Sequence, residues 1–373
     1  MLRPALALPL VLIALVASRA EAAECTWRVS GKLAVVDSYT AYPAVTRPLV
    51  GVKVQVAATL YSWGGFTAWD TVETDHTGRF QIVQTKSCSA RRLRVWMKLD
   101  NADLQVVNPD AAEWTLLRDD PSGAFSRWTS ATDLGTWTYA IGAPGVLGDH
   151  FAYRRAITWS LVDSLMRWLE SHDPWLAFGR KVHVRYPANT PGGSSWAAID
   201  TAYIHADERS DQWDIATVLH EVMHLWNYDH NNGVTNWLAA VLWDFDTHGE
   251  QEHPSIAFHE GFAEFAAYQM LTEMYPARFG QWHDEAYLDF DTLTEIERND
   301  DAVAATLWLM QGSLVPTVDM LLCFRGNAAL GWPRDLELGG TDDGLLMYLD
   351  RCNDLLASFT DAEYGTLLAT VNP

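Results

Sequence analysis

The sequence is short of positive charge. It has 26 lysine and arginine residues against 48 aspartate and glutamate residues, which gives a formal net charge of −22 at pH 7. Binding to nucleic acid or to an anionic membrane surface depends on clustered basic side chains, so this balance argues against both partners. A hydrophobic content of 49% and an aromatic content of 12% exclude intrinsic disorder for most of the chain.

Long apolar segments are also scarce. After the N-terminus, no segment reaches the roughly 20 apolar residues that a membrane-spanning helix needs, so stable membrane insertion is not expected. The N-terminus itself carries Arg3, a short apolar run over residues 6–16 and the small-x-small triplet at residues 20–22. This order is typical of a cleavable signal peptide and predicts that residues 1–22 are removed. We therefore expect a secreted protein, in the extracellular space, the periplasm or at the cell surface.

Cysteine is rare as well. The chain has four cysteines and no Cys-x-x-Cys motif, so a zinc site built on cysteine is not expected. In an exported chain, four cysteines predict two disulfides, with three connectivities available. Pairing between neighbours in the sequence is the simplest of them and predicts the bridges Cys25–Cys88 and Cys323–Cys352.

The chain of 373 residues is long enough for two or three domains. Residues 23–110 contain short segments with the alternation of β-strands, for example residues 50–56, and we expect an all-β sandwich there. The motifs P-L-V-G-V at 48–52 and T-D-x-x-G-x-F at 74–80 resemble transthyretin-like or carboxypeptidase-regulatory-like sandwich domains. Residues 111–148 are interpreted as a connector.

From residue 149 onward the pattern becomes mainly helical. An amphipathic helix is predicted from residue 150 to about Pro174, and two strands are predicted over residues 181–186 and 201–205. Further helices are predicted over residues 212–228 and from Pro254 to about Met274. Residues 149–373 are therefore expected to form an α+β domain that is mostly helical.

The most informative segment is residues 219–226, which contains H-E-x-x-H on a predicted helix. His220 and His224 lie four positions apart and thus on one helix face, so both imidazoles can reach one metal ion. Glu221 lies at the edge of that face, where it could hold a metal-bound water. Because the five-residue pattern also arises by chance, the two histidines could instead be ordinary, partly buried side chains.

A third ligand separates these interpretations. One candidate is Glu260, which is followed by Gly261 and shares its helix face with Glu264. The small glycine would allow this helix to approach another closely, and Glu264 could hydrogen-bond the second nitrogen of a ligating histidine. The other candidate is His230, because H-E-x-x-H-x-x-N-x-x-H nearly matches the extended metzincin motif, with Asn227 in the place of glycine.

H-E-x-x-H followed by an E-G-x-A-E-F helix resembles the gluzincin metallopeptidases, which include thermolysin and aminopeptidase N. The resemblance favours Glu260 over His230 and implies a zincin-like domain that binds Zn²⁺ through His220, His224 and Glu260. It also implies hydrolysis of a peptide or protein substrate by a zinc-activated water, with Glu221 as general base.

Two other parts of such a site are implied less directly. The strand over residues 201–205 is in the position where zincins have the edge strand that pairs with an extended peptide. A hydrogen-bond donor should also stabilise the developing oxyanion. The sequence offers several candidates for this donor: His248, His283, Tyr268, Tyr275 and Tyr287.

Two other functions compete with the peptidase. The chain could be a non-catalytic, peptidase-like binding or surface protein. It could also be a glycoside hydrolase that uses Glu260 and Glu264, but carboxylates on adjacent turns of one helix lie on the same side of a substrate rather than flanking it. The sequence does not indicate an oligomeric state.

Overall fold

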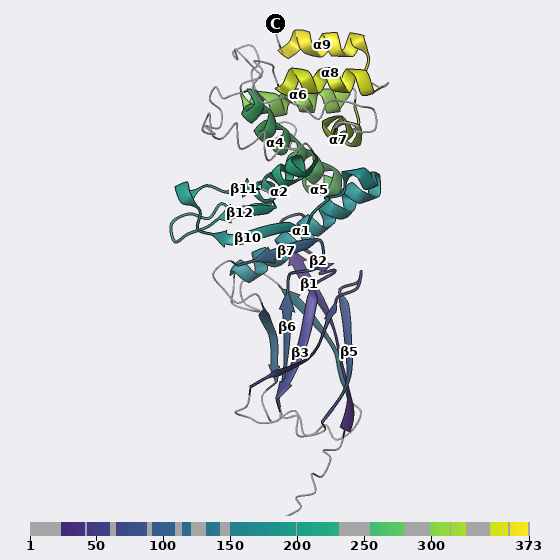
Figure 1. Cartoon of the computed structure of the whole chain (residues 1–373), viewed down its shortest axis with the longest axis vertical. Helices are drawn as coiled ribbons and strands as arrows, with labels where there is room; N and C mark the ends of the chain where they lie inside the picture. Colours follow the sequence, from purple (N-terminus) through teal and green to yellow (C-terminus); the bar gives the residue numbers. More distant parts are fainter. Residues whose placement is uncertain are drawn as a thin grey trace, which may run out of the picture.

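The computed structural model describes residues 24–41, 43–59, 65–87, 92–108, 114–120, 132–141, 150–198, 200–230, 254–279, 299–313, 315–325, 344–356 and 359–371. The N-terminal part of these residues is rich in strands and the C-terminal part is rich in helices (Figure 1). The predicted signal peptide, residues 1–22, lies outside them. Within the described residues, no helix combines the length and the apolar character that crossing a membrane would require.

The strand-rich part contains two four-stranded sheets. The first sheet has the order β2-β1-β5, with β9 also paired to β1. Its strands are β1 (Glu24–Asp37), β2 (Val45–Pro48), β5 (Arg79–Ser87) and β9 (Thr132–Ile141). The second sheet has the order β4-β3-β6-β8 and is antiparallel throughout. Its strands are β3 (Lys53–Thr59), β4 (Thr67–Glu73), β6 (Arg92–Lys98) and β8 (Thr115–Asp120).

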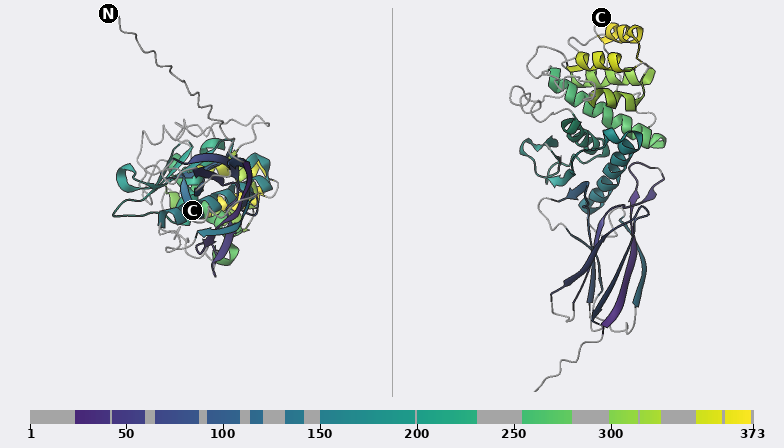
Figure 2. Two further views of the ribbon diagram at one scale, coloured as in Figure 1. Left: turned by 90° about the horizontal axis from the view of Figure 1, so that it is seen from below. Right: turned by 45° about the vertical axis from the view of Figure 1, so that its right-hand side comes forward.

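Buried residues from the two sheets belong to one hydrophobic core. Val29 and Leu33 of β1 lie in the same cluster as Val54 and Val56 of β3. The alternation predicted for residues 50–56 is confirmed over residues 52–56, where the even-numbered residues are buried and the odd-numbered ones are partly exposed. Figures 1 and 2 show these strands at one end of an elongated molecule, with the last helices at the other.

The segment interpreted as a connector, residues 111–148, contains structure that the sequence analysis missed. β8 pairs with β6 in antiparallel fashion, and β9 pairs with β1 in parallel fashion. Conversely, one strand from the predicted sandwich segment 23–110 lies in a different sheet. This strand, β7 (Leu104–Val107), pairs in parallel with β10 (Val182–Ala188) of the C-terminal part.

β7 thus completes a third four-stranded sheet, with the order β11-β12-β10-β7. The two remaining strands of this sheet are β11 (Trp196–Ala198) and β12 (Thr201–His205). One face of the sheet carries small and branched apolar side chains and packs against the helices α1 (His150–His172) and α2 (Ile215–His230). Two 3-10 turns, η2 (Pro174–Leu176) and η3 (Pro191–Gly193), connect these elements.

The rest of the described chain is helical. It comprises α4 (Pro254–Met274), α5 (Pro276–Phe279), α6 (Asp300–Ser313), α7 (Thr317–Arg325), α8 (Gly344–Leu355) and α9 (Asp361–Val371). α4 packs against α2 on one side and against α6 on another, so it links the third sheet to the terminal helices. The bounds predicted for α4 are confirmed.

Polar contacts join the N-terminal sheets to the third sheet. Asp100, which follows β6, accepts hydrogen bonds from Lys181 at 2.5 Å and from Lys53 at 3.0 Å. The indole of Trp159 in α1 donates to the carbonyl of Val50 at 2.9 Å. Together with β7, these contacts tie the two parts of the chain to each other.

The cysteines differ in part from the prediction. Cys25 is disulfide-bonded, and its predicted partner Cys88 lies outside the described residues. Cys323 in α7 and Cys352 in α8 are thiols with no exposed surface, so the predicted Cys323–Cys352 bridge is wrong. Both side chains lie in the hydrophobic cluster of the helical part, where cysteine serves as a small apolar residue.

Candidate metal centre

The helix that carries H-E-x-x-H is fixed at its N-terminus by Asp214. The carboxylate of Asp214 accepts hydrogen bonds from the backbone N–H of Thr217 at 2.8 Å and from the Thr217 hydroxyl at 2.6 Å. An acidic residue at this position satisfies N–H groups that the first helical turn leaves unpaired, and it also interacts favourably with the helix dipole. α2 consequently begins at Ile215, three residues later than predicted.

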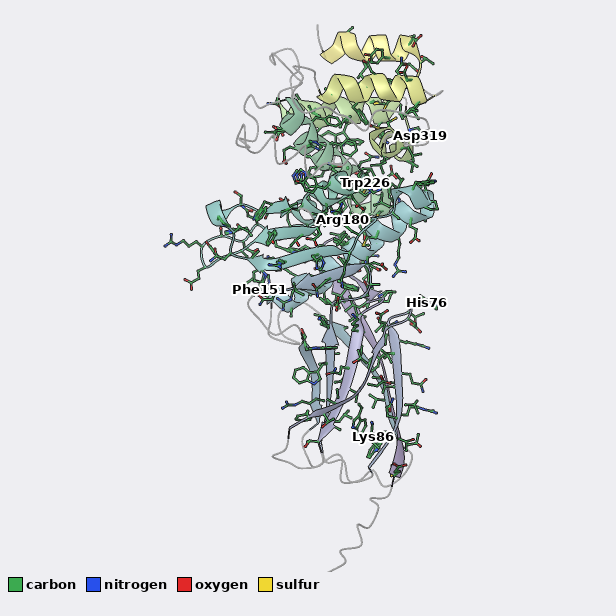
Figure 3. All side chains as sticks on the ribbon, viewed as in Figure 1. His76, Lys86, Phe151, Arg180, Trp226 and Asp319 are labelled. Carbon is green, nitrogen blue, oxygen red and sulfur yellow. The ribbon has the colours of Figure 1, made fainter. Side chains whose placement is uncertain are left out.

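The apolar side of α2 holds the helix in a fixed rotation. Trp226, labelled in Figure 3, donates its indole N–H to the carbonyl of Leu176 at 2.8 Å and stacks against Phe262 of α4. The other fully or almost fully buried apolar residues on this helix are Val218, Leu219, Val222, Met223 and Leu225. Because α2 could not turn without unpacking them, the direction of its two site histidines is determined by the core.

The second helix of the site, α4, is positioned from behind by a glycine. A Cβ atom at Gly261 would overlap the carbonyl oxygen of Asp300 and would lie 2.8 Å from Cβ of Val303, both in α6. The close helix approach predicted from Gly261 is therefore an approach to α6. The preceding residue, Glu260, points to the other side of α4, toward α2.

Three side chains converge between α2 and α4. Nε2 of His224 lies 3.0 Å from Nε2 of His220 and 2.9 Å from Oε2 of Glu260. Nε2 of His220 lies 3.1 Å from the same carboxylate oxygen. The structure thus brings together the three residues that the sequence analysis favoured as ligands, although Glu260 is 36 and 40 positions away from the two histidines.

The donor set fits a zinc ion. Zinc lies about 2.0–2.2 Å from imidazole nitrogen and carboxylate oxygen, so two ligand atoms at a tetrahedral angle are about 3.3 Å apart. The three observed separations of 2.9–3.1 Å are slightly shorter than this value. Two His and one Glu are also the protein ligands of one established class of catalytic zinc sites, in which the fourth position takes water or substrate.

The electrostatics of Glu260 agree with a ligand role. Burial on its own would raise the pKa of this carboxyl group. The charge of His224 and the hydrogen bonds from His220 and His224 outweigh burial and hold the pKa well below its usual value. Glu260 is therefore ionised at neutral pH, which is the form that binds a metal ion.

Two further groups near these three side chains stay neutral. Burial, assisted by the charge of His224, lowers the pKa of His259 to about 4. Burial, assisted by the charges of Glu260 and Glu221, raises the pKa of Tyr228 well above its usual value. Tyr228 is a neighbour of the site that the sequence analysis missed, although it lies one helical turn after His224 and on the same face.

The two remaining predicted carboxylates lie on the same helices as the ligands. Glu221, in α2, is only 6% exposed. Glu221 and Glu260 both contribute to the raised pKa of Tyr228, so both carboxylates lie within electrostatic range of that phenol. Glu264 is half-buried in α4, one turn after Glu260, and its predicted hydrogen bond to a ligating histidine stays a prediction.

The structure does not bring His230 to the other histidines. Its Nδ1 lies 2.9 Å from the carbonyl oxygen of Trp226, and its Nε2 lies 3.2 Å from that of Trp175. Its ring stacks on the indole of Trp226 at 4.3 Å. Among the described residues, the group able to hold a metal ion consists of His220, His224 and Glu260. The metzincin-like alternative therefore has no support in the geometry.

The candidate oxyanion donors divide into two groups. His248, His283 and Tyr287 lie outside the described residues. Tyr275 lies under the guanidinium of Arg47, a residue of β2, so it belongs to the contact with the N-terminal part. Tyr268 is the other described candidate. Burial raises its pKa to about 12, and the nearby carboxylates of Glu264, Asp214 and Asp301 contribute to the shift.

The edge strand also differs from the prediction. Residues 201–205 form β12 as expected, but β12 is an internal strand between β11 and β10. Among the described strands, the one at the edge is β11, which is antiparallel to β12 and packs against α2. A three-residue strand is too short to show an alternating pattern, which explains why it was missed.

Comparisons with known proteins add no function. No protein family and no curated protein matches the chain. Among solved structures, a 9R-lipoxygenase from Cyanothece PCC8801 is similar over 40% of this chain and 25% of its own length, with 12% identity and a TM-score of 0.19. A similarity with such a low TM-score indicates neither the fold nor the activity of this chain.

Proposed function

We propose that this protein is a secreted, zinc-dependent metallopeptidase of the gluzincin type. The observation that carries the proposal is the convergence of His220, His224 and Glu260 within 2.9–3.1 Å, with Glu221 adjacent to the first histidine. Two imidazoles, which bind a metal ion in their neutral form, and one ionised carboxylate are a donor set for zinc, and an additional buried carboxylate next to it is suited to act as a base.

Each residue has a separate task in this proposal. A bound zinc ion supplies Lewis-acid activation of a water molecule and of the scissile carbonyl group. Glu221 accepts the proton that the attacking water loses and then delivers it to the leaving amine. Its low exposure limits competing bulk water and strengthens its electrostatic interactions. Tyr228, held as a neutral phenol, contributes no negative charge that would compete with Glu221.

An extended peptide is the substrate that suits the surroundings. No described strand pairs with the outer edge of β11, and β11 packs directly against α2, which carries Glu221. A peptide could therefore add to the sheet as a further strand and be held by backbone hydrogen bonds next to the candidate metal site. The mixed sheet packed on α1 and α2 supports a zincin-like fold for the C-terminal part.

Export rests on two observations of different kinds. Residues 1–22 have the charge, apolar run and small-x-small triplet of a signal peptide. Cys25, which directly follows the predicted mature start, is disulfide-bonded, as is usual in an oxidising compartment.

Metal analysis and activity of four proteins test this function. Purified wild-type protein should contain close to one zinc ion and should hydrolyse unfolded protein in a chelator-sensitive way. Glu221→Gln should keep the metal and lose hydrolysis. Glu260→Ala should lose the metal, whereas the matched control His230→Ala should keep it.

Two results would contradict the proposal. If the wild-type protein binds no zinc, the metal site is wrong. If it binds zinc but hydrolyses no peptide, the chain is a non-catalytic, peptidase-like binding protein. If His230→Ala loses zinc and Glu260→Ala keeps it, the third ligand is His230 and not Glu260.

A further inference from the structure

A row of flat side chains crosses three strands of the third sheet. Trp196 of β11 is the register partner of Tyr203 in β12, and Tyr203 is the register partner of Arg185 in β10. The rings of Trp196 and Tyr203 are stacked, with centroids 4.5 Å apart and an interplanar angle of 6°. The guanidinium of Arg185 lies 5.3 Å from the centroid of the Tyr203 ring. We name these three residues the stacked row.

The stacked row ends at β11, which is the edge strand of the sheet within the described residues. Trp196 is its last member and is 37% exposed, although it is a large apolar residue. Within the described part of the chain, Tyr203 is its ring partner, and no strand continues the sheet beyond β11. Among the described residues, no second ring stacks on the Trp196 indole on the side where a further strand would be added.

A peptide that pairs with β11 must place a side chain next to this indole. Residues directly opposite each other in adjacent strands have Cβ atoms about 4.5–5.5 Å apart and point to the same face of the sheet. Trp196 and Tyr203 are such opposite residues, and their rings stack with the centroids 4.5 Å apart. The peptide residue opposite Trp196 therefore lies where it would extend the stacked row by one member.

We propose that Trp196 determines specificity by selecting an aromatic residue or arginine at the substrate position opposite it. This inference rests on the proposed peptidase function. Aromatic rings gain from offset stacking on indole, and a guanidinium gains from a cation–π contact, as Arg185 does on Tyr203. The formal net charge of −22 attracts cationic rather than acidic peptides to the protein as a whole, which suits arginine among these side chains.

The selection is confined to one substrate position. Along β11, Ala197 is almost fully buried and points to the opposite face from Trp196, toward the helices. Side chains of a paired peptide alternate in the same way, so the neighbours of the selected residue point to the α2 side. The stacked row crosses the strands and only Trp196 lies at the edge, so the row contacts only the peptide residue opposite Trp196.

Cleavage profiling tests this selection in the zinc-loaded, full-length protein. A mixture of peptides with all residues varied is digested, and the products are identified by mass spectrometry. The wild-type protein should favour Phe, Tyr, Trp and Arg over Ala at one position by about two- to tenfold, the factor expected from one stacking contact. Trp196→Ala should lose the preference at that position only, and Trp196→Phe should retain most of it.

A matched control uses another exposed indole. Trp175 is 68% exposed and lies in η2, away from β11, so Trp175→Ala should leave the profile unchanged. A second measurement does not need turnover. Calorimetric titration of Glu221→Gln with two peptides that differ only by Phe or Ala at the selected position should show the same two- to tenfold ratio of Kd values.

The outcomes separate this inference from the proposed function. If peptides are cleaved but the profile is flat at every position, or if Trp196→Ala leaves the preference intact, the role of Trp196 is refuted and the peptidase function stands. Equal Kd values for the two peptides refute it as well. If the zinc-loaded protein cleaves no peptide and Glu221→Gln binds neither peptide, the proposed function fails and this inference fails with it.

Discussion

Replacing Gly261 by alanine tests whether the contact between α4 and α6 positions the metal site. The added Cβ would overlap the carbonyl oxygen of Asp300 and would lie 2.8 Å from Cβ of Val303. A backbone oxygen cannot rotate away as a side chain can, so α4 has to shift. Overpacking of this kind costs about 1–3 kcal/mol, and we take the upper end because backbone is involved.

The substitution also has a favourable component, which must be subtracted. Alanine is preferred over glycine inside a helix by about 1 kcal/mol. The net loss in the free energy of unfolding should therefore be about 2 kcal/mol for Gly261→Ala. Because α4 carries Glu260, its displacement should also disturb the 2.9 Å and 3.1 Å separations from the two histidines and weaken zinc binding, by about tenfold.

Gly365 in α9 provides the matched control. A Cβ at this position would meet no atom within 4 Å, so Gly365→Ala should stabilise the protein by about 0.5–1 kcal/mol and leave zinc affinity unchanged. Urea unfolding gives the stability of both variants, and titration with a competing chelator gives the zinc affinity. If Gly261→Ala is as stable as Gly365→Ala and binds zinc as tightly as wild type, the role assigned to this helix contact is wrong.

Three further predictions concern the rest of the molecule. Burial acts to raise the pKa of Asp100, but Lys181 and Lys53 lower it from 3.8 to about 2. The contribution of Asp100 to stability is therefore present above about pH 4 and is lost as the pH falls toward 2. The difference in unfolding free energy between wild type and Asp100→Asn, measured in urea, should shrink over that interval. A fragment of residues 149–373 lacks β7 and should show no cooperative thermal transition, whereas the full chain should. Alkylation of the unfolded, unreduced protein should label Cys323 and Cys352 but not Cys25, as peptide mapping would show.

The local part of the site could be predicted from the sequence. His220 and His224 lie on one helix face because of the helical repeat alone, and the E-G-x-A-E motif indicated Glu260. Their approach to within about 3 Å depends on the packing of α4 between α2 and α6, which no local pattern encodes. The preference for Glu260 over His230 therefore came from the resemblance to a family and not from spacing.

The sheets were harder to predict because strand pairing is not local. β12 was expected at the edge, but three residues at 196–198 form a strand outside it. β8 and β9 lie in a polar, tryptophan-rich segment without a clean period of two, so they were interpreted as a connector. Pairing of β7 with β10 joins His183 to Gln105, which are 78 positions apart, and such partners cannot be identified from alternation alone.

The position of β7 has a consequence for how the chain reaches its native state. The backbone leaves the N-terminal sheets to supply β7, returns to them with β8 and β9, and only afterwards forms β10, the partner of β7. The third sheet therefore cannot be completed until β10 is available to pair with β7. Bringing β7 and β10 together closes a long loop, and this costs entropy before their parallel pairing gains any free energy. Folding should therefore be slow, as it is in proteins of high contact order. A chain with this topology spends a long time with exposed apolar strands, and the pairing of β7 with β10 makes the N-terminal and C-terminal parts unfold together once the native state has formed.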